Sequence, residues 1–475
     1  MTPDPKKNIR VRFAPSPTGP FSIGNARTAL FNWLFAKHTH GKFLVRVEDT
    51  DKERSKKKFE KDMLHGLEWL GLLWEEEITR QSDRENIYKK YLGELLEKSQ
   101  AYYCFCTSED LEIERQAQLS QGLAPKYGGR CRSSHLEEAK KKLKKESAVI
   151  RFKMPEREVS FSDLIRGRVE FNSGLIGDIV IAKSLTEPLY NFAAAIDDYE
   201  MKITHVIRGE DHLSNTPKQI LIQEALGFDH PEFAHLPLIL GGDRKKLSKR
   251  FLDRSLNDYE AEGYLSEAML NFLVLLGWHP VRDREVLSIE EMINEFELKR
   301  VQKAGAIFNP EKLEWFNGHY IKNKTVPELV KLIKKFVPEV WFEEKNLLEK
   351  AIETEKDRLR ILADFSRLAD FFFELPDYEK GRLIWKGSSE DLIAKNLAET
   401  EKIIESIPEE RFSKSNLEIQ ITPLTEREGR GEVLWPLRVA LSGKDASPGP
   451  FEIADVLGKN ETLRRIKIAI KKSQP

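Results

Sequence analysis

The pattern of the first 50 residues limits the folds open to this chain more than any other feature. Residues 9–13 alternate apolar and basic side chains (Ile-Arg-Val-Arg-Phe), which is typical of a strand with one buried face. A turn-rich stretch follows, and apolar residues then recur at helical spacing from Asn25 until Gly41. Residues 43–49 predict a second strand, which ends in two acids. The order strand, helix, strand predicts a right-handed parallel unit and therefore an α/β fold.

A second strand and helix of the same kind lie much further along the chain. Residues 202–208 predict a strand, and a short exit loop follows it. The next helix is predicted to begin with Thr216 as its N-cap, with Pro217 at the first helical position and Gln219 completing a capping box. Gly227 should end that helix.

Ligands of parallel sheets bind at the carboxyl ends of the strands, so the residues that follow these strands should meet in one crevice. A helix N-terminus at Gly24 and Asn25 offers backbone N–H groups to an anion. Arg12 offers a forked donor to a carboxylate, and Glu48 can accept an ammonium. Each charge alone is equally an ordinary surface charge, but together they favour a zwitterionic substrate beside a polyphosphate. The expected crevice residues are Arg12, Ser16, the 19–25 loop, Glu48, Arg208 and His212, the last of which is equally well explained as an ordinary loop histidine.

The bulk composition sets wider limits. At 475 residues, the chain is long enough for three to five compact units. A net charge of −1 does not point to nucleic acid, but residues 140–145 and 244–250 form two local basic runs. We interpret the first run as a solvated helix face. Residues 1–8 are polar, and no stretch approaches the roughly 20 apolar residues that span a bilayer, so we expect a cytoplasmic protein with no membrane partner.

Four motifs occur in a fixed order along the chain. They are Arg12-Phe-Ala-Pro-Ser-Pro-Thr-Gly, Arg46-Val-Glu-Asp-Thr-Asp51, Val206-Ile-Arg-Gly-Glu-Asp-His212 and Lys246-Leu-Ser-Lys-Arg250. Together they resemble the motif set of bacterial-type glutamyl-tRNA synthetases, which are class I aminoacyl-tRNA synthetases. Residues 435–443 and 447–454 resemble the C-terminal region of that family, so the resemblance covers nearly the whole chain.

The resemblance implies an α/β class I synthetase fold, in which a Rossmann-like parallel sheet carries an inserted acceptor-binding domain and an all-helical C-terminal half follows. The expected boundaries are 8–103 for the first half of the catalytic domain, 104–188 for the acceptor-stem-binding insertion, 189–250 for the second half with its Lys-Leu-Ser-Lys loop, 251–322 for a helical stem-contact domain and 323–475 for a helical anticodon-binding domain.

The resemblance also implies which residues bind glutamate. These residues are Arg12, Ala14, Ser16, Glu48, Tyr190 and Arg208. Arg12, assisted by Tyr190, would hold the side-chain carboxylate. Glu48 would accept the α-ammonium, and Arg208 would pair with the α-carboxylate, while the other two line the pocket.

A further set is implied for ATP binding and catalysis, namely Ser22, Gly24, Asn25, His212, Lys246, Ser248 and Lys249. The last three resemble a mobile loop that neutralises the phosphates while the glutamate carboxylate attacks the α-phosphorus. Phosphoryl chemistry of this kind needs positioning and charge stabilisation more than covalent help. The alternative reading of the loop is a solvated charge run.

Two positions depart from the family pattern. Ser22 stands where the family has a histidine, and Phe251-Leu252 replaces the His-Gly that usually follows the lysine loop. A serine hydroxyl is shorter and never cationic. If the histidine stabilises phosphate charge in the transition state, its loss would cost roughly 3 kcal/mol in the barrier. Activity would then be slow, or another group, Asn25 or His212, would compensate.

All three cysteines lie close together in sequence, at Cys104, Cys106 and Cys131. A clustered, odd-numbered set in a cytoplasmic chain favours a metal over disulfides. Zinc prefers four ligands in a tetrahedron, and the fourth would be Tyr127, as in some relatives with this spacing, or His135. We expect a structural zinc that holds the insertion, and the alternative is three reduced thiols.

The second half of the sequence is predicted to be helical, with helices over residues 265–277, 327–336, 356–373 and 392–407. Phe371, Phe372 and Phe373 are expected in the core rather than on an RNA-stacking surface. Only the family resemblance makes this region an anticodon reader. Within it Arg358 is the candidate for contacting an anticodon base, because arginine pairs bidentately with base edges, and an exposed helix charge is the alternative.

The predicted function is the ATP- and Mg²⁺-dependent ligation of L-glutamate to tRNA(Glu), by a monomer, through a glutamyl-adenylate. Three alternatives remain at this stage. The first is a non-discriminating enzyme that also charges tRNA(Gln). The second is the shortened paralogue that glutamylates a modified tRNA base, and the third is a catalytically impaired tRNA-binding scaffold. The paralogue lacks the C-terminal half that is present here, and only Ser22 favours the scaffold.

Overall fold

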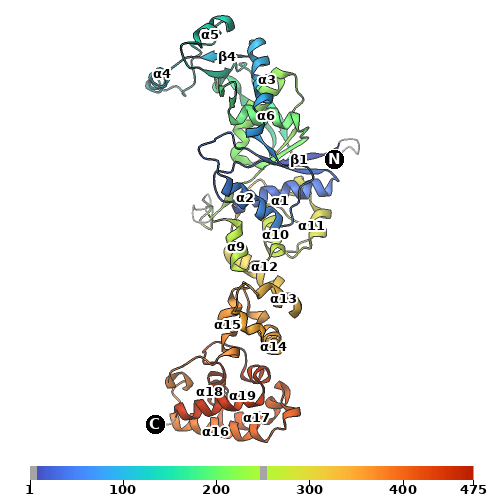
Figure 1. Cartoon of the computed structure of the whole chain (residues 1–475), viewed down its shortest axis with the longest axis vertical. Helices are drawn as coiled ribbons and strands as arrows, with labels where there is room; N and C mark the ends of the chain where they lie inside the picture. Colours follow the sequence, from blue (N-terminus) through green and yellow to red (C-terminus); the bar gives the residue numbers. More distant parts are fainter. Residues whose placement is uncertain (1–7, 246–253, 474–475) are drawn as a thin grey trace. The chain divides into compact units, whose positions relative to one another are not determined.

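The computed structural model describes residues 8–245 and 254–473, which form two compact units (Figure 1). The first unit contains the described residues up to Glu260 together with Ser266–Pro310. The second contains Ala261–Leu265 and the described residues from Glu311 onward. Lys246, Ser248, Lys249, Phe251 and Leu252 lie outside the described residues.

A seven-stranded sheet forms the centre of the first unit, in the order β3-β2-β1-β10-β11-β6-β7. Every neighbouring pair is parallel except β6 with β7 at one edge. The strands are β1 (Arg10–Phe13), β2 (Lys42–Val47), β3 (Thr79–Arg80), β6 (Glu158–Asp163), β7 (Gly167–Asn172), β10 (His205–Gly209) and β11 (Glu232–Leu236).

The α/β fold predicted from the sequence is therefore confirmed. Helix α1 (Ile23–His38) follows β1 and leads to β2 on one side of it, whereas β10 lies on the other side of β1. The strand order thus reverses between β1 and β10, and the carboxyl ends of parallel strands at such a switch point form a natural ligand crevice. Helices α2 (Lys57–Trp69), α3 (Glu85–Glu97), α6 (Tyr190–Glu200) and α7 (Thr216–Leu226) belong to the same unit.

The start of α7 differs from the prediction. Asn215 is the N-cap and makes no side-chain cap hydrogen bond, so neither the Thr216 cap nor the capping box with Gln219 forms. The preceding strand also starts later than predicted, at His205. The Thr216 hydroxyl instead accepts a hydrogen bond from Arg208, 2.9 Å away on β10, so tertiary bonding overrides the local signal. The predicted end at Gly227 is confirmed, with a left-handed φ of 78°.

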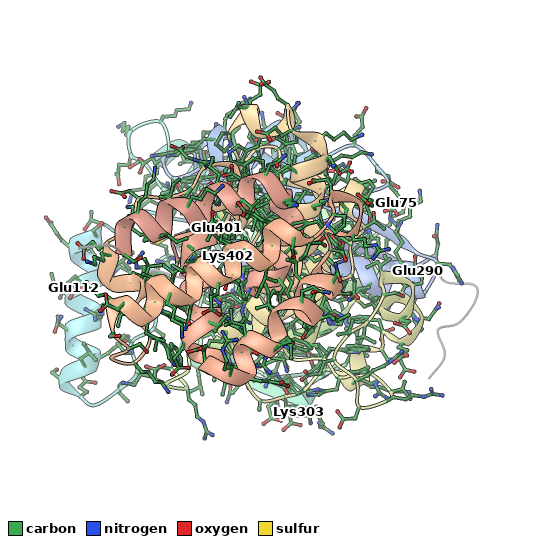
Figure 2. All side chains as sticks on the ribbon, turned by 90° about the horizontal axis from the view of Figure 1, so that it is seen from below. Glu75, Glu112, Glu290, Lys303, Glu401 and Lys402 are labelled. Atoms are coloured by element: carbon green, nitrogen blue, oxygen red, sulfur yellow. The ribbon has the colours of Figure 1, made fainter. Side chains whose placement is uncertain are left out.

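A second, four-stranded sheet is entirely antiparallel, in the order β4-β5-β8-β9. It comprises β4 (Ala101–Cys104), β5 (Val149–Phe152), β8 (Val180–Ser184) and β9 (Glu187–Pro188). Helices α4 (Ser108–Ser120) and α5 (Leu136–Lys142) come between β4 and β5, and α4 buries none of its residues. The lysines of the 140–145 run are exposed, which confirms the solvated face predicted for them. Glu112, on α4, projects outward from the ribbon (Figure 2).

The remainder of the first unit contains β12 (Ile239–Leu240), β13 (Ala306–Ile307), α9 (Leu256–Glu262), α10 (Ser266–Leu275) and α11 (Ile289–Glu295), with one end of α9 in the second unit. Helix α10 confirms the apolar helix predicted at 265–277 and packs against α1.

Short 3₁₀ turns occur in both units. They are η1 (Gln81–Asp83), η2 (Ser173–Leu175), η3 (Glu210–Asn215) and η4 (Leu298–Arg300) in the first unit, and η5 (Glu339–Phe342), η6 (Lys356–Arg358), η7 (Lys380–Leu383) and η8 (Glu409–Arg411) in the second.

The described part of the second unit is entirely helical, as predicted. Its helices are α12 (Pro310–Lys322), α13 (Val326–Ile333), α14 (Lys345–Glu355), α15 (Asp364–Phe373), α16 (Glu390–Ser406), α17 (Lys414–Glu428), α18 (Arg430–Ser442) and α19 (Pro450–Ser473). Phe371 and Phe372 are buried, which confirms their predicted place in the core. None of the helices in the described ranges is both long and apolar enough to cross a membrane.

The single helix predicted over 356–373 is wrong, because the chain breaks between η6 and α15. Leu359 is extended, and the Asp364 carboxylate accepts hydrogen bonds from the backbone N–H groups of Arg360 and Ile361. Such side-chain bonds compete with helical ones. The Leu362 N–H donates to the carbonyl of Gly263, whose positive φ of 94° brings the two backbones together.

Glu355 makes the stability of the second unit depend on pH. It is fully buried, and its only hydrogen-bonded oxygen accepts from Arg358 at 2.7 Å. Burial raises the pKa of Glu355 to about 7, against the opposing charge of Arg358. Because this pKa exceeds that of the unfolded chain, the stabilising contribution is complete below pH 4.5 and is lost as the pH rises through about 7.

We therefore expect the Glu355→Gln variant to lose less stability than the wild type between pH 5.5 and 8.5. The difference in the free energy of unfolding should change by about 2 kcal/mol over this range, from the linkage relation. Denaturant titrations of both proteins at the two pH values measure it. Parallel pH profiles would show that Glu355 is ionised throughout.

Candidate functional site

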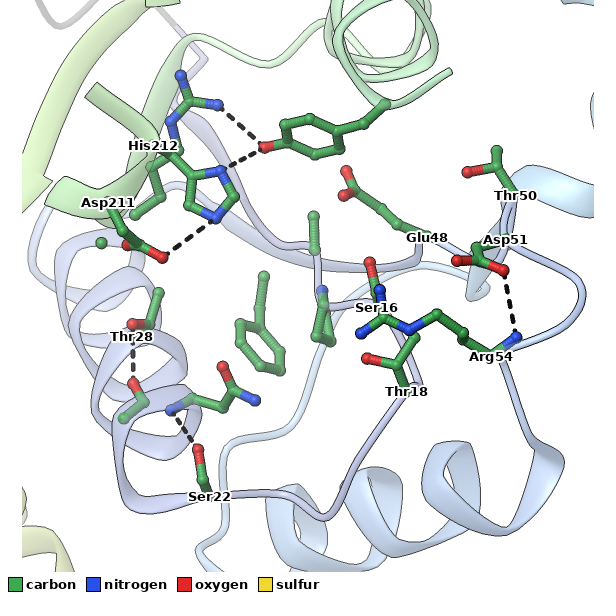
Figure 3. A pocket seen from close by; sticks show the side chains of 18 of the residues that line it. Ser16, Thr18, Ser22, Thr28, Glu48, Thr50, Asp51, Arg54, Asp211 and His212 are labelled. Atoms are coloured by element: carbon green, nitrogen blue, oxygen red, sulfur yellow. Dashed lines mark hydrogen bonds and ion pairs between the residues drawn. The ribbon is translucent and has the colours of Figure 1, made fainter. Parts of the chain in front are cut away.

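A cleft of about 1150 Å³ opens at the carboxyl ends of the central strands (Figure 3). It is larger than a pocket for one small amino acid requires. The structure brings together in its lining all the described residues predicted to bind glutamate or ATP. These are Arg12, Ala14, Ser16, Ser22, Gly24, Asn25, Glu48, Tyr190, Arg208 and His212.

A buried chain of alternating charges includes Arg12 and Glu48, which line the cleft, and continues behind them. The Arg12 Nε donates to Asp198 Oδ1 at 3.1 Å, and the Arg46 Nη1 donates to the same oxygen at 2.7 Å. Arg46 also donates through Nη2 to Glu48 Oε1 at 2.9 Å. Arg46 is completely buried, and the other three are nearly so. One cation thus fixes both the partner of Arg12 and the carboxylate of Glu48.

The electrostatics of this chain leave Glu48 short of positive charge. Burial raises the pKa of Glu48 despite the nearby charges of Arg46 and Arg12. Burial acts in the same direction on Asp198, but there the two arginines outweigh it and hold the pKa low. A buried carboxylate whose pKa is raised gains from any further cation that reaches it. Glu48 is therefore suited to receive an ammonium group from a ligand in the cleft.

Arg208 supplies positive charge on another wall. Its Nη1 is 3.4 Å from the Tyr190 hydroxyl, which lies 2.9 Å from Nδ1 of His212 (Figure 3). Burial, followed by the charge of Arg208, lowers the pKa of His212 to about 4. His212 is consequently neutral near pH 7, and its Nδ1 accepts a hydrogen bond from the Tyr190 hydroxyl. His212 is thus tied into the cleft and is not a plain loop histidine.

The N-terminus of α1 faces the cleft through Ser22, Gly24 and Asn25. Ser22 is the N-cap, and its hydroxyl accepts from the backbone N–H of Asn25 at 3.5 Å, a long hydrogen bond. Serine is among the preferred N-cap residues, so helix capping gives a physical reason for serine at this position. The long bond leaves the hydroxyl able to turn toward a ligand.

Several residues that build the site were not assigned from the sequence. Asp197 lies behind the cleft and accepts hydrogen bonds from Gln81, Arg84 and Tyr88. Asp198 follows it on α6, and both aspartates are buried. Two adjacent acids at the end of the apolar run Phe-Ala-Ala-Ala-Ile were the available signal, because acids in an apolar helix need buried partners.

The three cysteines form a separate cluster. Their sulfur atoms all lie within 4.8 Å of one another, with Cys106 and Cys131 3.7 Å apart. The Tyr127 hydroxyl is 3.5 Å from the sulfur atoms of both Cys104 and Cys106. Burial tends to raise the pKa of the Cys104 thiol, but hydrogen bonds, that with Tyr127 first among them, outweigh burial and lower this pKa. His135, the other predicted fourth ligand, is not in this group.

Arg358 lies in the second unit and is half-buried beside Glu355. Its Nη1 donates to Glu355 Oε2 at 2.7 Å, so part of its donor fork is occupied. The bond pins the guanidinium at the end of α14, next to the break in the predicted helix.

Comparison with known families assigns both parts of the chain. Residues 8–315 match the profile described as tRNA synthetases class I (E and Q), catalytic domain. Residues 328–470 match the profile described as an anticodon binding domain.

Individual relatives match over nearly their whole length. A glutamate–tRNA ligase of Thermodesulfovibrio yellowstonii is 44% identical, covering 97% of this chain and 99% of that protein. Glutamate–tRNA ligase 2 of Thermoanaerobacter pseudethanolicus is 43% identical, covering 97% of this chain and 98% of that protein. The crystal structure of a glutamate tRNA ligase from Elizabethkingia meningosepticum, in complex with its amino acid, superimposes with a TM-score of 0.88 at 37% identity, covering 98% of this chain and 100% of that one.

The burial of Arg46 leads to a stability prediction. Replacing it by methionine leaves Glu48 and Asp198 buried without their shared cation, which should cost about 3–5 kcal/mol in the free energy of unfolding. Adding Glu48→Gln in the same chain should recover part of that loss, whereas Asp198 keeps Arg12 as its partner. Denaturant titrations provide the measurement.

The matched control is Arg10→Met on the same strand. Arg10 pairs with Glu76, which is 38% exposed, so its loss should cost less than about 1 kcal/mol. Equal costs for the two arginine variants would contradict the idea that Arg46 compensates buried charge.

Proposed function

The chain belongs to the class I tRNA synthetases of the glutamyl and glutaminyl group, and from this membership we propose that it ligates glutamate to tRNA(Glu) at the cleft. One observation carries the proposal. Arg12, Arg208 and the carboxylate of Glu48 line a single cleft and are buried, so that two cations and one anion match the two carboxylates and one ammonium of glutamate. Glutamine presents a neutral amide where glutamate has its side-chain carboxylate, so a charge-assisted hydrogen bond to Arg12 would be lost.

Each charge of glutamate is assigned to one residue. Arg12, with Tyr190 nearby, is proposed to hold the side-chain carboxylate, and Glu48 to accept the α-ammonium. Arg208 is proposed to hold the α-carboxylate, while Ala14 and Ser16 line the pocket. The raised pKa of Glu48 supports its part in this scheme, because the ammonium adds positive charge to a carboxylate that shares its one paired cation, Arg46, with Asp198.

ATP is proposed to bind beside glutamate, with its phosphates at the N-terminus of α1. The helix N-terminus at Gly24 and Asn25 suits an anion, and His212 offers a neutral ring. An oxygen of the glutamate α-carboxylate attacks the α-phosphorus, a new O–P bond forms, and pyrophosphate leaves. Mg²⁺ would come with the phosphates, since it is usually held by few carboxylates together with phosphate oxygens.

Lys246, Ser248 and Lys249 are proposed to neutralise the leaving pyrophosphate, and Ser22 to donate one hydrogen bond where the family has a histidine. In the second step a hydroxyl of the 3′-terminal adenosine attacks the carbonyl carbon of the adenylate, and AMP leaves. We assign the acceptor end of tRNA to the insertion, residues 104–188, and its anticodon to residues 323–475, with Arg358 as a base-contacting candidate.

The test is glutamate-dependent ATP–pyrophosphate exchange and tRNA charging by the purified protein. We expect glutamate, and not glutamine, to support both. Arg12→Gln should lower kcat/KM for glutamate about 100-fold, because a charge-assisted hydrogen-bond pair is worth about 3 kcal/mol. Arg10→Gln is the matched control, since Arg10 pairs with Glu76, outside the cleft lining.

The same assay separates the alternatives. Charging of tRNA(Gln) with glutamate at a similar rate would make the enzyme non-discriminating. Binding of tRNA without exchange under any condition would contradict catalysis and favour the scaffold, and Ser22→His would then be expected to restore exchange. Exchange with glutamine in place of glutamate would contradict the assignment of Arg12.

We propose that the cysteine cluster holds a structural zinc ion. The cluster fits the ion, because thiolates at about 2.3 Å from a tetrahedral zinc lie about 3.8 Å apart, close to the 3.7 Å between Cys106 and Cys131. Tyr127 is the favoured fourth ligand, since its hydroxyl already lies beside two of the sulfur atoms. When bound, the ion would crosslink β4 to the loop that carries Tyr127 and Cys131.

Elemental analysis of the protein purified without added metal should give one zinc per chain. Cys106→Ala should abolish it, and Tyr127→Phe should weaken retention during dialysis against a chelator, whereas His135→Ala should not. Retention by Tyr127→Phe together with loss in His135→Ala would reverse the choice of fourth ligand. Wild-type protein that contains no zinc would contradict the proposal and favour the alternative, in which the three cysteines are reduced thiols.

A further inference from the structure

Three parallel strands carry a buried row of polar side chains behind the cleft. Arg208 on β10 and His235 on β11 are register partners, so their side chains lie next to each other on one face of the sheet. Asp163 ends β6, the next strand. His235 is completely buried and does not line the cleft, whereas Arg208 does.

The hydrogen bonds of this row fix the tautomer of His235. The Arg208 Nε lies 3.2 Å from His235 Nε2, and a guanidinium can only donate, so Nε2 must be the acceptor. The proton of the neutral ring is then on Nδ1, which donates to Asp163 Oδ2 at 2.6 Å. His235 is therefore an uncharged link between a carboxylate and a guanidinium.

Asp163 is itself held rigidly. It accepts hydrogen bonds from the backbone N–H groups of Ile165, Arg166 and His235. Burial tends to raise the pKa of Asp163, but the hydrogen bond from the His235 imidazole and the backbone bonds from Arg166 and Ile165 keep this pKa below its ordinary value. A fixed carboxylate at the end of β6 thus orients the imidazole ring.

Arg208 differs in its partners from Arg12, which also lines the cleft, and from Arg46, which is buried behind it. Arg12 and Arg46 donate to carboxylates, whereas the hydrogen bonds given for Arg208 go to His235, Tyr190 and Thr216. All three of these groups are neutral. The row therefore holds the guanidinium in place without neutralising its charge, which stays available to an anion in the cleft.

We propose that His235, oriented by Asp163, is a positioning residue that aims Arg208 at the α-carboxylate of the amino acid and does so only in its neutral form. The inference rests on the proposed function, which assigns that carboxylate to Arg208. A protonated ring would present an N–H group at Nε2 to the guanidinium, break the hydrogen bond and add a like charge.

The charged or titratable groups near His235 are Asp163, Arg208, Arg166 and His212. Its other close neighbours are Thr216 and the rings of Phe161 and Phe233. Burial lowers the pKa of His235, the two arginines act in the same direction, and Asp163 opposes them. The neutral form therefore prevails near pH 7, and glutamate binding should weaken as the pH falls through the pKa of His235.

The experiment compares glutamate with 4-aminobutyrate, which keeps the ammonium and the side-chain carboxylate but lacks the α-carboxylate. Dissociation constants are measured by calorimetry from pH 5 to 8, together with the KM for ATP in tRNA charging. The variants are His235→Phe, which removes the acceptor, and His235→Gln, whose amide oxygen replaces Nε2 and cannot be protonated. His205→Gln, a buried histidine on β10 outside the cleft lining, is the matched control.

We expect His235→Phe to weaken glutamate about tenfold at pH 7.5, as loss of one hydrogen bond to a charged group predicts. Binding of 4-aminobutyrate and the KM for ATP should change less than twofold. His235→Gln should stay within threefold of the wild type at pH 7.5 and should lose the part of the acid weakening that affects glutamate but not 4-aminobutyrate. His205→Gln should match the wild type at every pH.

Equal weakening of both ligands in His235→Phe would overturn the proposal, because it would indicate general damage to the pocket. An acid weakening of glutamate relative to 4-aminobutyrate that is as large in His235→Gln as in the wild type would also overturn it. Failure of the proposed function would appear in the wild type itself, as absent glutamate binding and charging. A wild type that charges glutamate, with a His235→Phe variant that binds it normally, would refute the positioning role alone.

Discussion

The buried guanidinium of Arg46 is the interaction on which the geometry of the cleft depends. Burying a carboxylate is costly unless it is paired, and here two carboxylates share one cation that is completely removed from water. Because Asp198 also binds Arg12, the position of Arg12 follows from that of Arg46. The network spans β1, β2 and α6, so the packing of these elements sets where the charges of the cleft lie. Rigid secondary structure, rather than loops, therefore supports the charged groups.

The buried arginines at and behind the cleft have two kinds of hydrogen-bond partner. Arg12 and Arg46 are balanced by acids, whereas Arg208 is held by neutral partners. A cation that has only neutral partners keeps its full attraction for a ligand anion where water is excluded. Glu48 is the acidic counterpart of Arg208, since burial leaves it short of positive charge. A zwitterion bound between Glu48 and Arg208 would complete the electrostatic balance of the folded protein.

The sequence was sufficient to predict the parallel sheet, the helical second half and the cleft residues at strand ends, because alternation and strand termini are local properties. It was not sufficient where a side chain serves a distant partner. Thr216 has the local signature of a cap, yet its hydroxyl bonds Arg208 on a neighbouring strand. The break after Arg358 depends on Asp364 and on the backbone of Gly263, nearly 100 residues earlier in the chain. His235 gave no local signal, because its meaning comes from strand register.

The long stretch of chain between β1 and its neighbour β10 has a consequence for synthesis of the protein. Arg10 and Thr204, whose backbones join these strands, are separated by 194 residues. At a ribosomal rate of about 5–20 residues per second, β1 emerges about 10–40 s before the strand that completes its side of the sheet. During that interval β1 has only β2 to pair with, and one strand edge stays open. The alternating arginines of β1 place charge on that edge and discourage wrong pairing with other nascent chains.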